Sequence, residues 1–189
     1  VTVSGSTITK TGSAAWTNAG AYTLTGGTPP PANLSGTGNA LSNVITGNGG
    51  DNILDGAGGS DTLVGGLGND TYLFSSGYGA NTIIDSAGSD KLALGTGINY
   101  DQLWFAQNGN NLDVSVIGTS DKITIQDWYL GSANHVENIL SGDGKALQDT
   151  QVQNLVQAMA AFAPPSAGQT TLPSAYQTAL APVLAANWH

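Results

Sequence analysis

Four nine-residue units follow one another without a gap in this chain: GNALSNVIT (38–46), GNGGDNILD (47–55), GAGGSDTLV (56–64) and GGLGNDTYL (65–73). Position one of the unit is always glycine, position six is asparagine or aspartate, and position eight is a large apolar or aromatic residue. A phased period of nine is typical of a repeat architecture, since a flexible glycine-rich linker carries no apolar residue in phase.

The residue types predict a tight turn followed by a minimal strand. Glycine permits positive φ, and the turns it forms direct backbone carbonyl groups inward. The side chain at position six adds an oxygen beside those carbonyls, while position eight points to the interior, so that stacked units build a narrow apolar ladder. Position six holds Asn43, Asn52, Asp61 and Asp70, and position eight holds Ile45, Leu54, Leu63 and Tyr72.

Calcium suits such turns because it takes six to eight oxygen ligands at about 2.3–2.6 Å from carboxylates and carbonyls. Stacked Asp61 and Asp70 turns would repel one another without a cation, so we expect Ca²⁺ to supply the missing attraction. A stack that needs no calcium would leave these aspartates without a purpose. The candidate turn residues besides position six are Gly47, Gly49, Gly56, Gly58, Gly65 and Leu67.

The repeat block resembles the RTX family, because GGLGNDTYL has the pattern Gly-Gly-x-Gly-x-Asp-x-apolar-x at every defining position. The resemblance implies an all-β fold, a parallel β-roll in which two nonapeptides form one coil and calcium lies between turns one coil apart. Asp61 would then share an ion with Asn43, and Asp70 with Asn52. Asparagine carries no charge and implies weaker sites, which Asp51 would strengthen if its turn slips by one residue.

The pattern resumes imperfectly after residue 73. Asn81 and Asp90 each stand two residues before an apolar residue and lie nine apart, after a slip of two residues. We therefore expect further sites that pair Asp61 with Asn81 and Asp70 with Asp90. Asp85 is an additional carboxylate in this stretch.

The flanks of the roll, which we assign to residues 38–97, predict three further parts. Residues 1–37 read as two or three short strands before an elbow at Pro29–Pro31, either a cap or the tail of a larger region. Residues 98–147 read as strands around a hairpin turn at 108–111, are similar to the haemolysin-type calcium-binding related domain, and are expected to close the roll.

Residues 148–189 predict a helical tail, with one helix that has Asp149 or Thr150 as its N-cap and a second over 175–186 that Pro182 should kink. The lysine-free, alanine-rich tail resembles the uncleaved carboxy-terminal signal of type I secretion substrates. An equally simple interpretation is that the helices cap the roll.

The composition favours cations as partners. Asp and Glu number 13 against 4 Lys and Arg, which gives a net charge of −9, so nucleic acid and anionic membranes are poor electrostatic partners. Cysteine is absent, and no apolar run approaches the ~20 residues of a membrane span. The first residues show no charged-then-apolar leader, an absence that cleavage would also produce.

No catalytic constellation is visible in the sequence. His135 is the one interior histidine, no Gly-x-Ser-x-Gly elbow accompanies it, and we expect it on a surface loop. Trp104 and Trp128 could form a sugar-binding platform, although core packing is the simpler interpretation. Any catalytic domain of a larger protein would lie before Val1.

The sequence therefore predicts a non-enzymatic calcium-binding module of a secreted bacterial protein, which folds on meeting extracellular calcium and supports type I secretion. One alternative is a calcium-stabilised adhesin that binds a glycan through its tryptophans or the asparagine-rich loop 108–111. A further alternative is the non-catalytic carboxy-terminal part of a secreted hydrolase.

Overall fold

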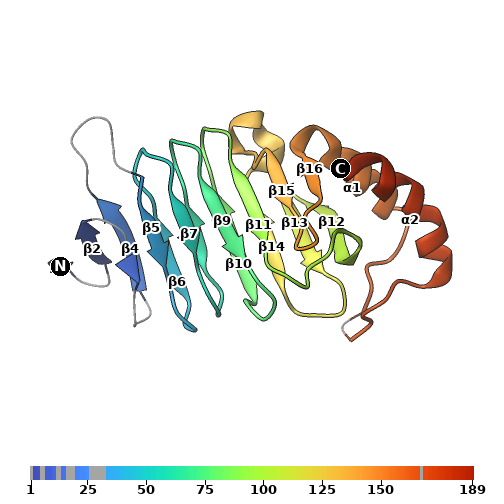
Figure 1. Ribbon diagram of the computed structural model, residues 1–189, viewed down its shortest axis with the longest axis horizontal. Coiled ribbons are helices and arrows are strands. Elements are labelled where there is room, and N and C mark those ends of the chain that lie inside the picture. The colour runs from blue at the N-terminus through green and yellow to red at the C-terminus, as the bar shows by residue number, and fades with distance from the viewer. Residues whose placement is uncertain (1, 5–6, 12–13, 16–19, 26–32, 167) are drawn as a thin grey trace.

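A computed structural model describes residues 2–4, 7–11, 14–15, 20–25, 33–166 and 168–189 (Figure 1). Most of the regular elements are short strands, and two helices follow them. The strands are β1 (Thr2–Ser4), β2 (Thr7–Thr11), β3 (Ala14–Ala15), β4 (Gly20–Thr25), β5 (Ser35–Thr37), β6 (Asn43–Thr46), β7 (Ile53–Asp55), β8 (Thr62–Val64), β9 (Thr71–Phe74), β10 (Ala80–Ile84), β11 (Lys91–Leu94), β12 (Leu103–Asn108), β13 (Asn111–Val116), β14 (Lys122–Ile125), β15 (Asn138–Leu140) and β16 (Ala146–Gln148). The helices are α1 (Asp149–Met159) and α2 (Ser174–Asn187), and short 3₁₀ segments span Tyr100–Gln102, Trp128–Leu130 and Ser132–Asn134.

The repeats form a roll of two sheets. The first sheet has the order β1-β2-β4-β6-β8-β10-β14-β13-β12, and the second has the order β16-β15-β11-β9-β7-β5-β3. From β3 to β11 successive strands alternate between the sheets, so each coil gives one strand to each sheet (Figure 1). The parallel pairing of neighbours confirms the all-β parallel β-roll.

The register joins the repeats in the expected pairs. β6 pairs with β8 and β7 with β9, which places repeat one beside repeat three and repeat two beside repeat four. Residues stacked across these coils are 18 apart in sequence, as for Asn43 and Asp61. The next coil is longer, since Asp61 and Asn81 are 20 apart, and this extra length is the slip seen in the sequence.

The core is a ladder of position-eight side chains. Ile45, Leu63 and Ile83 are aligned across the first sheet, and Leu54, Tyr72 and Leu92 across the second. All six are fully or almost fully buried. Each coil contributes only about two such residues, so a coil has little core of its own and depends on its neighbours.

The amino-terminal flank continues the roll. β2 pairs in parallel with β4 and β4 with β6, while β3 pairs in parallel with β5 in the second sheet. β1 pairs with β2 in antiparallel orientation and is the last strand of the first sheet. The segment thus supplies five short strands, more than the two or three predicted. The elbow predicted at Pro29–Pro31, and Val1, lie outside the described residues.

The other flank ends the roll by a change of strand direction. β14 and β15 still pair in parallel with β10 and β11. Beyond them, β13 pairs with β14 and β16 pairs with β15, both in antiparallel orientation. β12 and β13 form the hairpin predicted around 108–111. Helix α1 packs against β12 and β16 and covers this end (Figure 1).

The helical tail is packed into the fold. Val152, Leu155 and Met159 of α1 are buried, and α2 packs against α1. Trp188, just after α2, is also buried, and His189 forms two backbone hydrogen bonds with Ala146 of β16 (2.8 and 3.0 Å). No helix of the described residues has the length and apolarity to cross a membrane.

Two side chains near this end bear on expectations from the sequence. His135 lies on a loop before β15, as expected, but is half-buried there, because its ring stacks on Trp128 at 4.0 Å and its Nδ1 lies 2.9 Å from Asp149 Oδ2. The N-cap of α1 is Gln148, so neither Asp149 nor Thr150 caps the helix. Trp104 and Trp128 are both only 4% exposed, so neither can form a platform for a sugar.

Candidate metal centre

The turns of the roll form two columns. We call the turns that lead from the second sheet to the first (38–43, 56–61 and 75–79) the first edge. The turns that lead from the first sheet to the second (47–52, 65–70 and 85–90) form the second edge. Position six of each nonapeptide therefore falls on one edge or the other in alternation.

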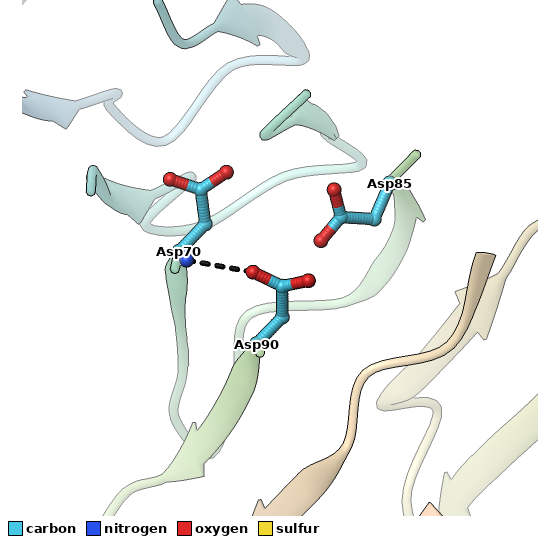
Figure 2. Close-up of side chains that lie close together, drawn as sticks. All are labelled: Asp70, Asp85 and Asp90. Carbon is cyan, nitrogen blue, oxygen red and sulfur yellow. Dashed lines mark hydrogen bonds between the residues drawn. The ribbon is translucent and has the colours of Figure 1, made fainter. Parts of the chain in front are cut away.

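Position-six side chains are linked along each edge by one kind of hydrogen bond. On the first edge, Asp61 Oδ1 accepts the N–H of Asn43 at 2.8 Å, and Asn81 Oδ1 accepts the N–H of Asp61 at 2.9 Å. On the second edge, Asp70 Oδ1 accepts the N–H of Asn52 at 2.7 Å, and Asp90 Oδ1 accepts the N–H of Asp70 at 2.7 Å (Figure 2). The structure thus brings together all four side-chain pairs named from the sequence.

The second oxygen of each aspartate is left without a partner. Asp61 Oδ2 and Asp70 Oδ2 are buried and make no hydrogen bond within the described structure. Burial raises the pKa of each carboxyl to about 6, although the N–H groups of Asn43 and Asn52 act in the opposite direction. A buried, unpaired carboxylate oxygen is costly, and a bound cation would remove the cost.

In the first two turns, the asparagine at position six has its side-chain oxygen hydrogen-bonded within its own turn, unlike the aspartates. Asn43 Oδ1 accepts the N–H of Asn39 at 2.9 Å, and Asn52 Oδ1 accepts that of Asn48 at 2.8 Å, both within the residue's own turn. The Asn52 amide also donates to Asn48 Oδ1 at 2.8 Å. These turns satisfy their oxygens internally, so they depend less on a cation than the aspartate turns do.

Glycine at position one makes room for the side chain at position six. A Cβ on Gly56 would collide with the Asp61 carboxylate, and one on Gly65 would collide with Asp70 and the Tyr72 hydroxyl. A Cβ on Gly47 would lie 2.8 Å from the carbonyl oxygen of Gly65 in the next turn. The Gly65 carbonyl oxygen and the Asn52 amide oxygen of the adjacent turn are therefore close together, which is the arrangement of oxygens that the predicted site requires. The remaining candidates, Gly49, Gly58 and Leu67, lie within the same turns.

Asp51 lies outside this arrangement. Asn52, and not Asp51, is in register with Asp70, so the turn does not slip. The Asp51 side chain is exposed, with Oδ1 accepting the N–H of Asn69 at 2.8 Å and Oδ2 lying 3.4 Å from the Asn33 amide.

Two acidic residues that the sequence reasoning missed extend the columns. Glu137 Oε2 accepts the N–H of Asp90 at 2.6 Å and continues the second edge. Asp121 accepts the N–H groups of Gly77 and Gly79, at 2.7 and 3.0 Å, on the first edge. Both stand two residues before a buried isoleucine, the spacing already used to find Asn81 and Asp90, so the signal was present in the sequence.

The donor set fits calcium. It consists of carboxylate, amide and carbonyl oxygens without nitrogen or sulfur ligands, which is the preference of a hard divalent cation. Asp70, Asp85 and Asp90 also form a cluster whose ligand atoms all lie within 4.8 Å of one another (Figure 2).

The fold and these turns define a calcium-binding β-roll. Residues 37–72 and 74–100 match the RTX calcium-binding nonapeptide repeat family (four copies), and residues 111–147 match the haemolysin-type calcium binding protein related domain. The repeat region therefore consists of RTX nonapeptide repeats, and the closing region contains the related domain expected from the sequence.

Proposed function

We propose that this chain is a non-catalytic module that folds on binding calcium outside the cell and takes part in type I secretion of a larger bacterial protein. The observation that carries the proposal is the set of buried carboxylate oxygens without partners in the turns. Such oxygens repel one another when ionised, so the roll gains stability only when a cation joins them.

The free-energy linkage supports conditional folding. A site with free calcium ten-fold above its dissociation constant contributes about 1.4 kcal/mol, so a few sites supply a large part of the stability of a typical domain. Extracellular calcium modules have dissociation constants of about 10⁻⁴–10⁻³ M, which favours the folded state outside the cell and the unfolded state inside.

The packing of the tail gives secretion a direction. Trp188 is buried and His189 is paired with β16, so the very end of the tail would be free to meet export machinery before the roll has folded. Low calcium would keep the tail available, and calcium outside would fold it away. Binding of a glycan through Trp104 and Trp128 gains no support, since both lie in the core, whereas residues 108–110 of the asparagine-rich loop are exposed.

Hydrogen exchange read by mass spectrometry on the whole chain tests the folding part. We expect amides of residues 38–97 to exchange slowly in calcium and rapidly in EGTA. Equal protection in both conditions would contradict it. The secretion part is tested by fusing residues 148–189 to a passenger in cells with a type I exporter, where a passenger that stays inside would contradict it.

A further inference from the structure

The turn at residues 85–90 differs from every nonapeptide turn before it. Position one is glycine in the four repeats, at residues 38, 47, 56 and 65, but the equivalent residue here is Asp85. Its side chain points from the end of β10 toward Asp70 and Asp90 (Figure 2). A third carboxylate thus enters a place that the other turns keep free of any side chain.

The three carboxylates have no countercharge among the described residues. Asp70, Asp85 and Asp90 are 1%, 3% and 1% exposed, and neither of the two ion pairs in the described structure involves them. Asp85 Oδ1 accepts the N–H of Ser86 at 2.7 Å, but Asp85 Oδ2 and Asp70 Oδ2 are buried without a partner. An isolated cluster of this charge would be strongly unfavourable in a buried turn.

A buried hydroxyl lies at the same place. Tyr72 is 0% exposed, and its Oη faces the Asp85 and Asp70 carboxylates without a hydrogen bond of good geometry. A Cβ added to Gly65 would collide with both this hydroxyl and the Asp70 carboxylate, so the two groups are neighbours. Burial, and next the charges of Asp85 and Asp70, raises the pKa of the Tyr72 hydroxyl, so the phenol stays neutral beside them.

We propose that Asp70, Asp85 and Asp90 hold a calcium ion with Asp85 as a direct ligand, and that this site fills before the other turns of the roll. The inference rests on the proposed function, because it assumes that the turns bind calcium. Three carboxylates attract a divalent cation more strongly than the single carboxylate that Asp61 offers between Asn43 and Asn81.

The location gives early filling a structural consequence. Asp90 donates its N–H to Glu137 at 2.6 Å, and Glu137 directly precedes β15. An ion that fixes Asp90 therefore stabilises the contact between the last repeat and the closing region. Calcium binding would therefore begin at the end of the second edge that contacts the closing region through Asp90 and Glu137.

Calcium titration calorimetry of the whole chain tests the proposal, with Asp85→Asn compared against Asp51→Asn. Both changes remove one charge near Asp70 without changing side-chain size, but Asp51 is exposed and outside the cluster. We expect wild type and Asp51→Asn to show one site about ten-fold tighter than the rest, and Asp85→Asn to lose it. Asp85→Gly, which restores the glycine of the other repeats, should lose it as well while still folding at saturating calcium.

Three results would overturn the inference: no tighter site in wild type, a tight site that survives Asp85→Asn, or equal weakening by Asp51→Asn and Asp85→Asn. Each of them leaves the proposed function standing if the chain still binds calcium and folds with it. A wild-type chain that binds no calcium at all would instead remove the proposed function, and this inference with it.

Discussion

The two edges of the roll are built from the same nonapeptide yet carry different charge. On the first edge, the column contains Asn43, Asp61, Asn81 and Asp121, with two carboxylates. On the second edge, the column contains Asn52, Asp70, Asp90 and Glu137, with three carboxylates, and Asp85 adds a fourth. The backbone repeat therefore fixes where cations can bind, while the residue at position six decides how much each turn needs one.

The largest expected effect comes from removing a carboxylate from the second edge. Asp70→Asn should raise the calcium midpoint of folding about ten-fold, equivalent to ~1.4 kcal/mol, because Asp70 lies between Asn52 and Asp90 and faces Asp85. Asp61→Asn should raise it by only about three-fold, since its neighbours are amides. Tyrosine and tryptophan fluorescence during calcium titration measures both midpoints, and a larger shift for Asp61→Asn would reverse the comparison.

The stability of the calcium-free fold should decrease as pH rises, whereas the affinity for calcium should increase. The pKa of Asp61 and of Asp70 is raised from 3.8 to about 6 by burial, so the calcium-free fold binds more protons than the unfolded chain between these values. Its stability is then highest below about pH 4 and is lost as pH rises through about 6. Calcium needs ionised ligands, so its affinity should increase over the same window.

Thermal unfolding in EGTA and in calcium, each at pH 4.5 and 7.5 (values chosen to bracket roughly that window), checks this prediction. We expect a melting transition in EGTA at the acidic pH alone, and the gain on adding calcium to be larger at the neutral pH. A calcium-free fold that becomes more stable toward neutral pH would contradict the role assigned to the buried carboxyls.

A third prediction adds charge instead of removing it. Asn52→Asp removes the amide that donates to Asn48 and places another carboxylate beside Asp70. We expect no folded state in EGTA at neutral pH, as for wild type, and a melting temperature about 2–4 °C higher in calcium, for a change near 1 kcal/mol. Asn43→Asp is the matched change on the first edge and should act in the same directions. A gain of stability in EGTA would show that these turns are not closed by their amides.

The smallest effect is expected at Asp51. Its carboxylate is exposed and already accepts the N–H of Asn69, so Asp51→Asn should change the calcium midpoint and the melting temperature by less than about 0.5 kcal/mol equivalent. Calcium titration and thermal unfolding of Asp51→Asn, each compared with wild type, check this prediction. A shift as large as that of Asp70→Asn would make Asp51 a ligand after all.

The sequence predicted what local spacing determines. The nine-residue phase predicted a stack of units with a buried ladder at position eight, and the resemblance to the RTX family predicted the roll and the pairing of alternate repeats. The helical periodicity placed both tail helices to within a residue or two.

Features that depend on side-chain direction or on distant partners were missed. Asn52 closing its own turn is a matter of rotamer, and spacing alone does not specify it. Glu137 meets Asp90 across 47 residues, and His135 meets Trp128 and Asp149 only because the closing region folds back on α1. The spacing of Glu137 to Ile139 would have suggested the first of these contacts.

The most direct test of the central claim is far-ultraviolet circular dichroism of the whole chain during a calcium titration from EGTA to about 10 mM, which brackets the affinities of extracellular modules. A cooperative gain of β signal near millimolar calcium is the predicted result, and it would tie folding to the buried carboxylates. A spectrum already folded in EGTA at neutral pH, and unchanged by calcium, would contradict it.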